Sequence, residues 1–387
     1  MIRGSPVTLD LQSARQTFDS SADFTVGIEE EFHLLDPATL KLVPAFEGLR
    51  AAADEDPVLA ESIAGELISS EIEIRSGRGE DIHDALTRQR DRRRRLFALA
   101  ARQGLALGAT GTNPVSDYRD QQIIDTEHYR RLDKELGYVA WRNNTWSLHV
   151  HVGVRGADRA VRVCDRLRPV LPLLLAISAS SPFIDCRDSG LHSGRSEIFT
   201  RTFPRCGIPD PLGSWDAFEE YLRFLEATNS IVEFTQVWWS IRPHLTFGTV
   251  EVRICDAQPT AGESEALAAL IVACVAQAAR DEDESVPFAD PAPRLVEENL
   301  WRAIRYGQDG KLIDLERAEE YDAREAAPRL LAWTAPARAQ LGIDPAFPEL
   351  NGAQRQRRLI DTGATPAEVF SATVRETADT YATEVVA

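Results

Sequence analysis

Charged side chains recur at alternate positions of four short segments, and their types could bind divalent metal ions. The segments are 24–35, 68–75, 145–155 and 247–255. In the first two segments, Glu29, Glu31 and Glu73 alternate with apolar residues. Residues two apart in a β-strand lie on the same face of a sheet. Each segment therefore predicts a strand with one apolar face and one face that carries charged groups.

The third and fourth segments continue the pattern with imidazole and guanidinium groups. His149 and His151 alternate with leucine and valine, and Glu251 and Arg253 alternate with valine and isoleucine. In a common sheet, these strands would bring carboxylates, imidazoles and a guanidinium to one side.

A half-exposed antiparallel sheet is the simpler interpretation of any single segment. Solvated strand faces usually mix charges, whereas these faces carry five acidic groups with little positive charge between them. Carboxylates on paired strands lie about 5 Å apart and repel each other, and a cation would relieve that repulsion. Oxygen ligands with one or two imidazoles suit Mg²⁺ or Mn²⁺ better than zinc or copper. The predicted metal ligands are Glu29, Glu31, Glu73, His151 and Glu251.

Helices must hold these strands in place, and the apolar periodicity predicts several of them. The expected helices span 81–103, 158–180, 215–228, 263–280 and 365–382. Thr260 with Glu263, and Thr365 with Glu368, have the spacing of capping boxes at two helix starts. A short fifth strand is expected over 105–110. The whole pattern predicts an α+β fold built on a largely antiparallel sheet.

Arginine is the main basic residue, and arginines gather in two stretches of the chain. The run Arg92–Arg95 lies on the first long helix and is interpreted as a solvated helix face. The stretch 181–214 is rich in Gly, Pro, Ser and Arg, and at about thirty residues it predicts a long loop that is either functional or disordered. Within it, Arg195, Arg201 and Arg205 could grip a substrate carboxylate or form a solvated basic edge. Arg195 is the best candidate of the three.

The composition excludes several classes of function. The chain has 387 residues, 43 Lys and Arg against 61 Asp and Glu, and a net charge of −18. This acidic balance argues against a general nucleic-acid or membrane-surface binder. Five cysteines without CxxC spacing indicate a reducing compartment rather than disulfides, although Cys186 and Cys206 could pair. With no signal peptide or membrane-length apolar segment, we expect a cytoplasmic protein.

Five motifs resemble, in order, those of the type 2 glutamate–cysteine ligases, carboxylate–amine ligases related to glutamine synthetase. The motifs are Gly-Ile-Glu-Glu-Glu (27–31), Glu-Ile-Glu-Ile (71–74), Thr-Gly-Thr-Asn-Pro (110–114), His-Val-His-Val-Gly-Val (149–154) and Gly-Thr-Val-Glu-Val-Arg-Ile-Cys-Asp (248–256). The resemblance extends to 299–307. It implies a glutamine synthetase-like, curved antiparallel sheet whose concave face forms an active-site funnel, with helices packed on the outer face.

The resemblance also predicts how the chain is divided. An N-terminal extension, 1–23, would precede the catalytic domain, 24–312. An acidic and proline-rich break after residue 280 introduces a C-terminal helical part, and 313–387 would pack on the same domain.

The reaction that the resemblance implies joins a carboxylate to an amine. ATP phosphorylates the carboxylate, classically the γ-carboxylate of glutamate, and the amine attacks the acyl phosphate to give an amide, ADP and phosphate. The expected cofactors are ATP and Mg²⁺ or Mn²⁺. The expected partners are small molecules, namely glutamate or a similar carboxylate and cysteine or another small amine. A homodimer is the assembly that the resemblance suggests.

Individual roles follow from the same resemblance. His151 would contact a metal and the nucleotide phosphates, and Arg253 would neutralise the transferring phosphoryl group. Arg242 is a further candidate for nucleotide binding. Glu66 would receive the incoming amine. Because it lies seven residues before Glu73, it must sit in a bulge or a loop to reach the same face.

Some alternatives stay open from the sequence. His149 could assist His151 or only support it by hydrogen bonding. A turn that ends the strand is the better account of the motif around Thr110 and Thr112, although the family resemblance also allows them to approach the substrate. The carboxylates could instead activate water in a metal-dependent hydrolase, or the protein could bind nucleotide without turnover.

Overall fold

The predicted strands form one antiparallel sheet in the computed structural model, which describes residues 9–383. The strands of this sheet are β1 (Val26–Leu35), β2 (Ile63–Ala64), β3 (Glu71–Arg75), β4 (Ala106–Gly108), β5 (Ser147–Gly153), β10 (Ile241–His244) and β11 (Thr249–Asp256). Their order is β10-β11-β5-β1-β3-β2, and β4 also pairs with β1. The sheet is open, with β10 and β2 at its two ends. The prediction of an α+β fold on an antiparallel sheet is confirmed.

The expected strands are present with small changes at their ends. β3 begins at Glu71 rather than Ile68, because Ser69 and Ser70 form a turn just before it. β11 carries a register shift between Val252 and Cys255 against its neighbour β5. Such a bulge re-aims the side chains of the strand on which it lies.

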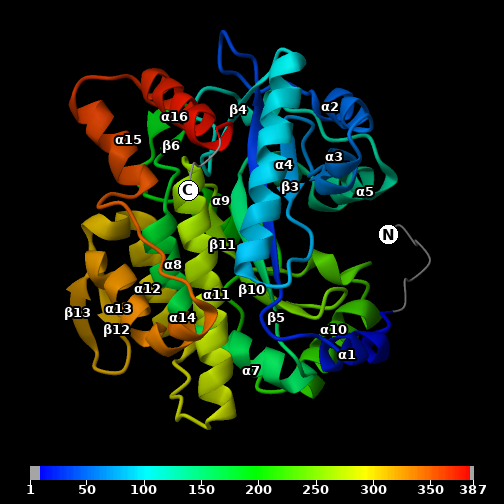
Figure 1. Ribbon diagram of the computed structural model, residues 1–387, viewed down its shortest axis with the longest axis vertical. Coiled ribbons are helices and arrows are strands. Elements are labelled where there is room, and N and C mark those ends of the chain that lie inside the picture. Colours follow the sequence, from blue (N-terminus) through cyan, green and yellow to red (C-terminus); the bar gives the residue numbers. More distant parts are fainter. Residues whose placement is uncertain (1–8, 384–387) are drawn as a thin grey trace.

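Four helices cover the apolar face of the sheet (Figure 1). They are α4 (Ile82–Arg102), α7 (Ala157–Leu167), α8 (Leu171–Ser178) and α11 (Ala261–Asp283). Val150 and Val252 from the sheet are fully buried among their side chains. Burying each apolar side chain of this size contributes about 1.5–3 kcal/mol to stability. This layer fixes which face of each strand turns away from the helices.

α11 is long and apolar enough to cross a membrane by composition alone. However, 89% of its most apolar window is buried inside the protein. Its Thr260 hydroxyl accepts a hydrogen bond from the Glu263 amide, as expected for a helix start. α11 is therefore a central core helix of this fold.

Two segments differ from their predicted form. The single helix expected over 158–180 is divided into α7 and α8 by a 3₁₀ turn, η2 (Arg168–Val170), because prolines 169 and 172 lack the amide donors that a continuous helix needs. The loop expected over 181–214 contains β6 (Phe183–Ile184), β7 (Arg187–Asp188), α9 (Gly194–Thr202) and β8 (Cys206–Gly207). In α9, the Ser193 hydroxyl caps the helix by accepting from the Ser196 amide.

The interpretation of Arg92–Arg95 as a solvated face is wrong for Arg93. Its side chain is 1% exposed, and its guanidinium donates to both carboxylate oxygens of Glu30 at 2.5 and 2.6 Å. Glu30 is the one acidic residue on the apolar face of β1. A buried carboxylate requires a partner, and α4 supplies it from a distant part of the chain.

The remaining elements surround this framework. Before the C-terminal part lie α1 (Leu11–Asp19), α2 (Phe46–Ala53), α3 (Pro57–Ser62), η1 (Tyr118–Asp120), α5 (Glu127–Leu136), α6 (Tyr138–Trp141), α10 (Trp215–Ala227), η3 (Phe234–Gln236) and β9 (Trp238–Trp239). After them come α12 (Pro293–Tyr306), η4 (Gly307–Asp309), β12 (Lys311–Asp314), β13 (Glu319–Asp322), η5 (Ala323–Glu325), α13 (Ala326–Trp333), α14 (Ala335–Leu341), α15 (Gly352–Asp361) and α16 (Pro366–Tyr381). α16 begins with the predicted capping box of Thr365 and Glu368.

The C-terminal part is not purely helical, because β12 and β13 form a hairpin within it. Residues 1–8 of the predicted N-terminal extension lie outside the described residues, whereas α1 packs Leu11 and Phe18 into the main core. The proposed boundaries at 23 and 312 stay predictions. All five cysteines are unpaired, including Cys186 and Cys206.

Candidate functional site

The face of the sheet that points away from the helices lines a cavity of about 420 Å³. Strand register brings the predicted groups opposite one another across this face. The pairs are Glu31 with Glu73, Glu29 with His149, and Glu251 with His151. All six residues line the cavity, so side chains from segments far apart in sequence meet at one place.

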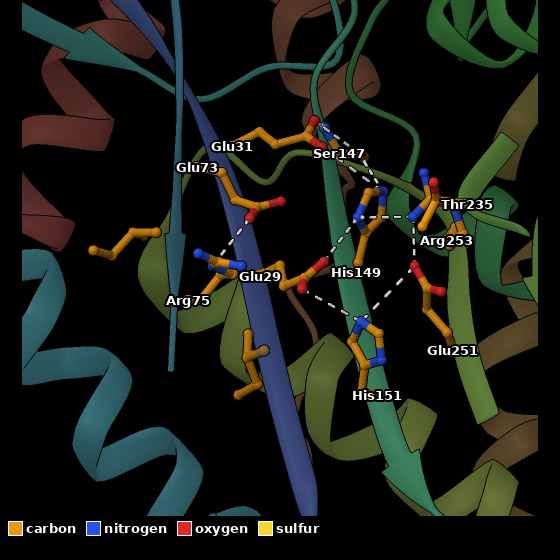
Figure 2. A network of polar contacts seen from close by, with 12 residues as sticks. Glu29, Glu31, Glu73, Arg75, Ser147, His149, His151, Thr235, Glu251 and Arg253 are labelled. Atoms are coloured by element: carbon orange, nitrogen blue, oxygen red, sulfur yellow. Dashed lines mark hydrogen bonds and ion pairs between the residues drawn. The ribbon is translucent and has the colours of Figure 1, made fainter. Parts of the chain in front are cut away.

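Three groups of these side chains could each hold a metal ion. They are Glu29, His151 and Glu251; Glu29, Glu73 and His149; and Glu31, Glu66 and Glu73. Within each group, the potential ligand atoms lie within 4.8 Å of one another. Because Glu29 and Glu73 each belong to two groups, the three form a continuous row across the sheet (Figure 2).

His151 presents an imidazole nitrogen that fits a cation. Its Nε2 atom lies 3.4 Å from Glu29 Oε1 and 3.8 Å from Glu251 Oε1, and it is buried without a hydrogen-bond partner. Its Nδ1 atom lies 3.0 Å from the Thr249 hydroxyl. Burial opposes the charged imidazole, but the two carboxylates outweigh it and raise the pKa of His151. A lone nitrogen between two carboxylates is a donor set that a divalent cation can complete.

Two arginines surround Glu251 at one end of the row. Arg242 Nε donates to Glu251 Oε2 at 2.6 Å, and Arg253 Nη1 donates to Glu251 Oε1. Burial would raise the pKa of Glu251, but Arg242 and Arg253 hold it well below its usual range. Arg253 Nη1 also lies 3.4 Å from His149 Nδ1. This end of the cavity therefore combines one ionised carboxylate with two cationic side chains.

The opposite end is acidic. Glu66 lies in the loop between β2 and β3, a position that brings it to the polar face despite its spacing from Glu73. Burial and the nearby Glu31 raise its pKa to about 8. Burial and the neighbouring carboxylates also raise the pKa values of Glu71 and Glu73. The carboxyl groups at this end are crowded, and a bound cation would stabilise their ionised forms.

His149 contacts several polar groups of the site. Its Nδ1 lies 3.3 Å from Glu29 Oε2, and its Nε2 lies 2.7 Å from the Ser147 hydroxyl. The same hydroxyl donates to Glu31 Oε2 at 2.8 Å. Burial and the adjacent Arg253 lower the pKa of His149, so its neutral form is favoured. A neutral imidazole in this position can act as a metal ligand.

The three arginines of 181–214 are not equivalent. Arg195 lines the cavity, but its Nη1 and Nη2 atoms donate to the backbone carbonyls of Ile254 and Arg253. Arg201 pairs with Glu297, and Arg205 donates to a backbone carbonyl, and neither lines this cavity.

Thr110 and Thr112 are buried outside the cavity. The Thr110 hydroxyl donates to the Thr112 carbonyl, and the Thr112 hydroxyl donates to the Phe183 carbonyl. The turn that ends β4 accounts for their motif.

Strand parity did not identify the aromatic part of the cavity. Four of its residues lie on helices or in loops and turns, where no two-residue period applies, and Trp238 and His244 lie on β9 and β10, strands too short to show one; the six are Tyr129, Phe199, Phe203, Trp238, His244 and Phe247. Glu71 was recognised as acidic but not as a cavity residue, although its Oε2 atom is buried without a hydrogen-bond partner.

The sequence matches a known family over nearly its whole length. The model of the family described as glutamate-cysteine ligase family 2 matches residues 25–387. The chain is 38% identical over 345 residues to "putative glutamate–cysteine ligase 2-2" of Rubrobacter xylanophilus, with 88% of each chain covered. It is 40% identical over 310 residues to "putative glutamate–cysteine ligase 2" of Sorangium cellulosum, with 80% of this chain and 82% of that protein covered.

Solved structures with the same fold have diverged further in sequence. A glutamate–cysteine ligase of Francisella tularensis, crystallised with AMP, superposes with a TM-score of 0.62 at 14% identity and covers 95% of this chain and 91% of its own. A bifunctional glutathione synthetase of Pasteurella multocida gives 0.65 at 12% identity and covers 94% of this chain and 53% of its own. These likenesses concern the fold, whereas the sequence match concerns the family and agrees with the five ordered motifs. The chain belongs to glutamate-cysteine ligase family 2.

Proposed function

We propose that this protein is an ATP-dependent ligase that joins a carboxylate, the γ-carboxylate of glutamate or a similar acid, to a small amine. Membership of the family supports a carboxylate–amine ligase in general. The observation that carries the finer proposal is the row of three ligand groups beside Arg253 in one cavity. Such a row suits a reaction in which several phosphate oxygens must be neutralised together.

The residues present fit divalent metal ions such as Mg²⁺ or Mn²⁺. Glu29, Glu73 and Glu251 supply oxygen ligands. His151 supplies one nitrogen to the first group, and His149 supplies one nitrogen to the second. When bound, such ions neutralise phosphate oxygens and stabilise the transferring phosphoryl group. The carboxylate-rich ligand set is the kind these hard cations prefer.

Nucleotide binding has two kinds of support. A protein with this fold was crystallised with AMP, and the Arg253 end of the cavity is the cationic end. Arg253 would neutralise the negative charge that grows as the γ-phosphoryl group leaves ADP and bonds to the substrate carboxylate oxygen. Arg242 holds Glu251 in position and is a second candidate for phosphate contact.

The acidic end suits the amine substrate. An ammonium group is attracted to the crowded carboxylates of Glu66, Glu71 and Glu73. In its ionised form, Glu66 can accept the proton that the amine must lose before its nitrogen attacks the acyl phosphate carbon. The new bond is an amide, and the carbon–oxygen bond to phosphate breaks, so the products are amide, ADP and phosphate.

The test is ADP release by the purified protein with Mg²⁺, ATP and glutamate, first with cysteine and then with a panel of other small amines. The proposal expects ADP only when both substrates are present, with a γ-glutamyl amide identified by mass spectrometry. The variant Glu251→Gln is the matched inactive control. A cytoplasmic location and a homodimer stay predictions of the sequence.

Two other functions predict different results. A metal-dependent hydrolase would turn over an ester or amide without consuming ATP. A silent relative would bind nucleotide and form no ADP with any acid or amine. Either result would contradict the ligase.

A further inference from the structure

We infer that Phe247, backed by His244, forms the platform on which the base of the nucleoside triphosphate stacks. This inference rests on the proposed function, because it concerns the nucleotide of that reaction. It assigns a role to a turn between β10 and β11 that strand spacing did not single out.

Phe247 is an aromatic side chain that stacks on His244 at the cavity wall. It is 54% exposed and lines the same cavity as the metal-ligand candidates. Its ring stacks on that of His244, with centroids 4.3 Å apart and an interplanar angle of 8°. Gly248, with a φ of +62°, allows the tight turn that follows.

His244 fixes the ring from behind. It is 7% exposed and meets Phe234 edge to face, with centroids 5.0 Å apart. Its Nδ1 atom is buried without a hydrogen-bond partner. Since His244 covers one face of the Phe247 ring, the exposed part of that ring is available to a planar ligand.

The charges of the cavity orient the nucleotide toward this platform. The cationic side chains Arg242 and Arg253 lie on β10 and β11, the strands that this turn connects. The carboxyl groups of Glu31, Glu66 and Glu73 gather at the other end. A triphosphate is therefore favoured at the arginine end, whereas an ammonium group is favoured at the acidic end.

The platform lies close to the metal-ligand candidates where the phosphates are expected to bind. The Phe247 ring centroid lies 5.6 Å from that of His151, at an interplanar angle of 75°. His151 belongs to the ligand group nearest the two arginines. A base stacked on Phe247 would leave its ribose and first phosphates directed toward His151. Every base offers a π face, so this platform predicts affinity for the nucleoside part without strong selection of the base.

The test compares two ligands that both carry phosphate groups, of which only one carries a base. Isothermal titration calorimetry with Mg²⁺ measures the Kd of ADP and of inorganic tripolyphosphate for the wild type and for Phe247→Ala. We expect Phe247→Ala to weaken ADP binding by about 5- to 150-fold, the loss typical of one base–aromatic stack. Binding of tripolyphosphate should change by less than about twofold, because that ligand has no base.

Two further variants serve as controls. Phe247→Trp should keep ADP binding, because a larger aromatic ring still stacks. Phe224→Ala removes another exposed phenylalanine, which lies on α10 outside this cavity, and should leave both ligands unaffected.

The outcomes separate this inference from the proposed function. Unchanged ADP binding by Phe247→Ala would overturn the platform and leave the ligase intact. Equal losses for ADP and tripolyphosphate would also overturn it, because the turn would then act on the whole site. Failure of the wild type to bind either ligand would overturn the proposed function together with the platform.

Discussion

Arg195 is hydrogen-bonded to the backbone that carries Arg253. Its Nη2 atom donates to the Arg253 carbonyl at 3.0 Å, and its Nη1 atom donates to the Ile254 carbonyl at 3.1 Å. Both carbonyls lie in the bulge of β11, where pairing with β5 shifts register. Asp256 Oδ1 lies 3.7 Å from Arg195 Nη1 and helps to orient the guanidinium. The contacts favour a role for Arg195 in positioning Arg253 rather than in gripping a substrate carboxylate.

Replacing Arg195 by lysine tests this role. A single ammonium cannot reproduce the two-carbonyl contact, so the bulge and the Arg253 side chain should shift. We expect Arg195→Lys to lower kcat by about 10- to 100-fold, as small misplacements in active sites do. The KM for glutamate should change by less than about twofold. Steady-state kinetics measure both, and a raised KM with an unchanged kcat would show instead that Arg195 holds the substrate.

Glu73 and Glu251 should affect stability in opposite directions. The alternating carboxylates of the sequence predict that replacing Glu31 or Glu251 by alanine abolishes turnover and relieves repulsion in metal-free buffer. The structure separates the two cases, because other carboxylates crowd Glu73 whereas Arg242 and Arg253 neutralise Glu251. In metal-free buffer, Glu73→Gln should raise the free energy of unfolding, and Glu251→Gln should lower it by about 3–5 kcal/mol because the buried Arg242 and the partly buried Arg253 lose their shared partner.

Urea denaturation in the presence of a chelator measures both changes. Both variants should lack ligase turnover and show a smaller rise in Tm on addition of Mn²⁺ than the wild type. Changes of the same sign in the two variants would contradict this account of the cavity's charge distribution.

Arg93 should be essential for folding stability although it lies far from any proposed substrate. Arg93→Ala leaves the buried Glu30 carboxylate without its ion pair, so we expect a loss of about 3–5 kcal/mol. Arg95→Ala removes a neighbouring arginine that is 41% exposed, and should cost less than about 1 kcal/mol. Thermal and urea denaturation of the two variants, side by side, test the contrast. Equal effects would mean that the Glu30 pair is not a buried structural contact.

His192 should make the protein sensitive to acid. Burial, together with the charge of Arg357, lowers the pKa of His192 to about 4 from an ordinary 6.5. Its other charged neighbours are Asp309, Arg305 and Asp188. A group whose pKa is lower in the folded state is stabilising above its unfolded pKa. That contribution is therefore lost as the pH falls from about 6.5 toward 4.

The variant His192→Asn removes this titration. Between pH 6.5 and 4, the stability of the wild type should fall more steeply than that of the variant, by up to about 1.4 kcal/mol per pH unit. Urea denaturation at a series of pH values measures the two slopes. Parallel slopes would show that His192 becomes protonated without cost in the folded state.

The amino-acid sequence by itself determined which charged side chains share the polar face of each strand in the site. Alternation in a strand allows only two faces, so Glu29 and Glu31 had to share one side of β1, and His149 and His151 had to share one side of β5. The family resemblance carried by the motifs on these strands is confirmed by the family match. The capping residue Thr365 likewise predicted the start of α16, because its hydrogen bonds are local.

Only the tertiary structure decided which side chains meet. Glu66 joins Glu31 and Glu73 from the loop between the paired strands β2 and β3, and Arg93 on α4 pairs with Glu30 on β1. Phe247, which opens the predicted strand segment 247–255, lies instead in the turn before β11 and lines the cavity from there. Contacts of this kind depend on strand register and packing between distant segments. Periodicity specifies the face on which a side chain lies, but not its partner.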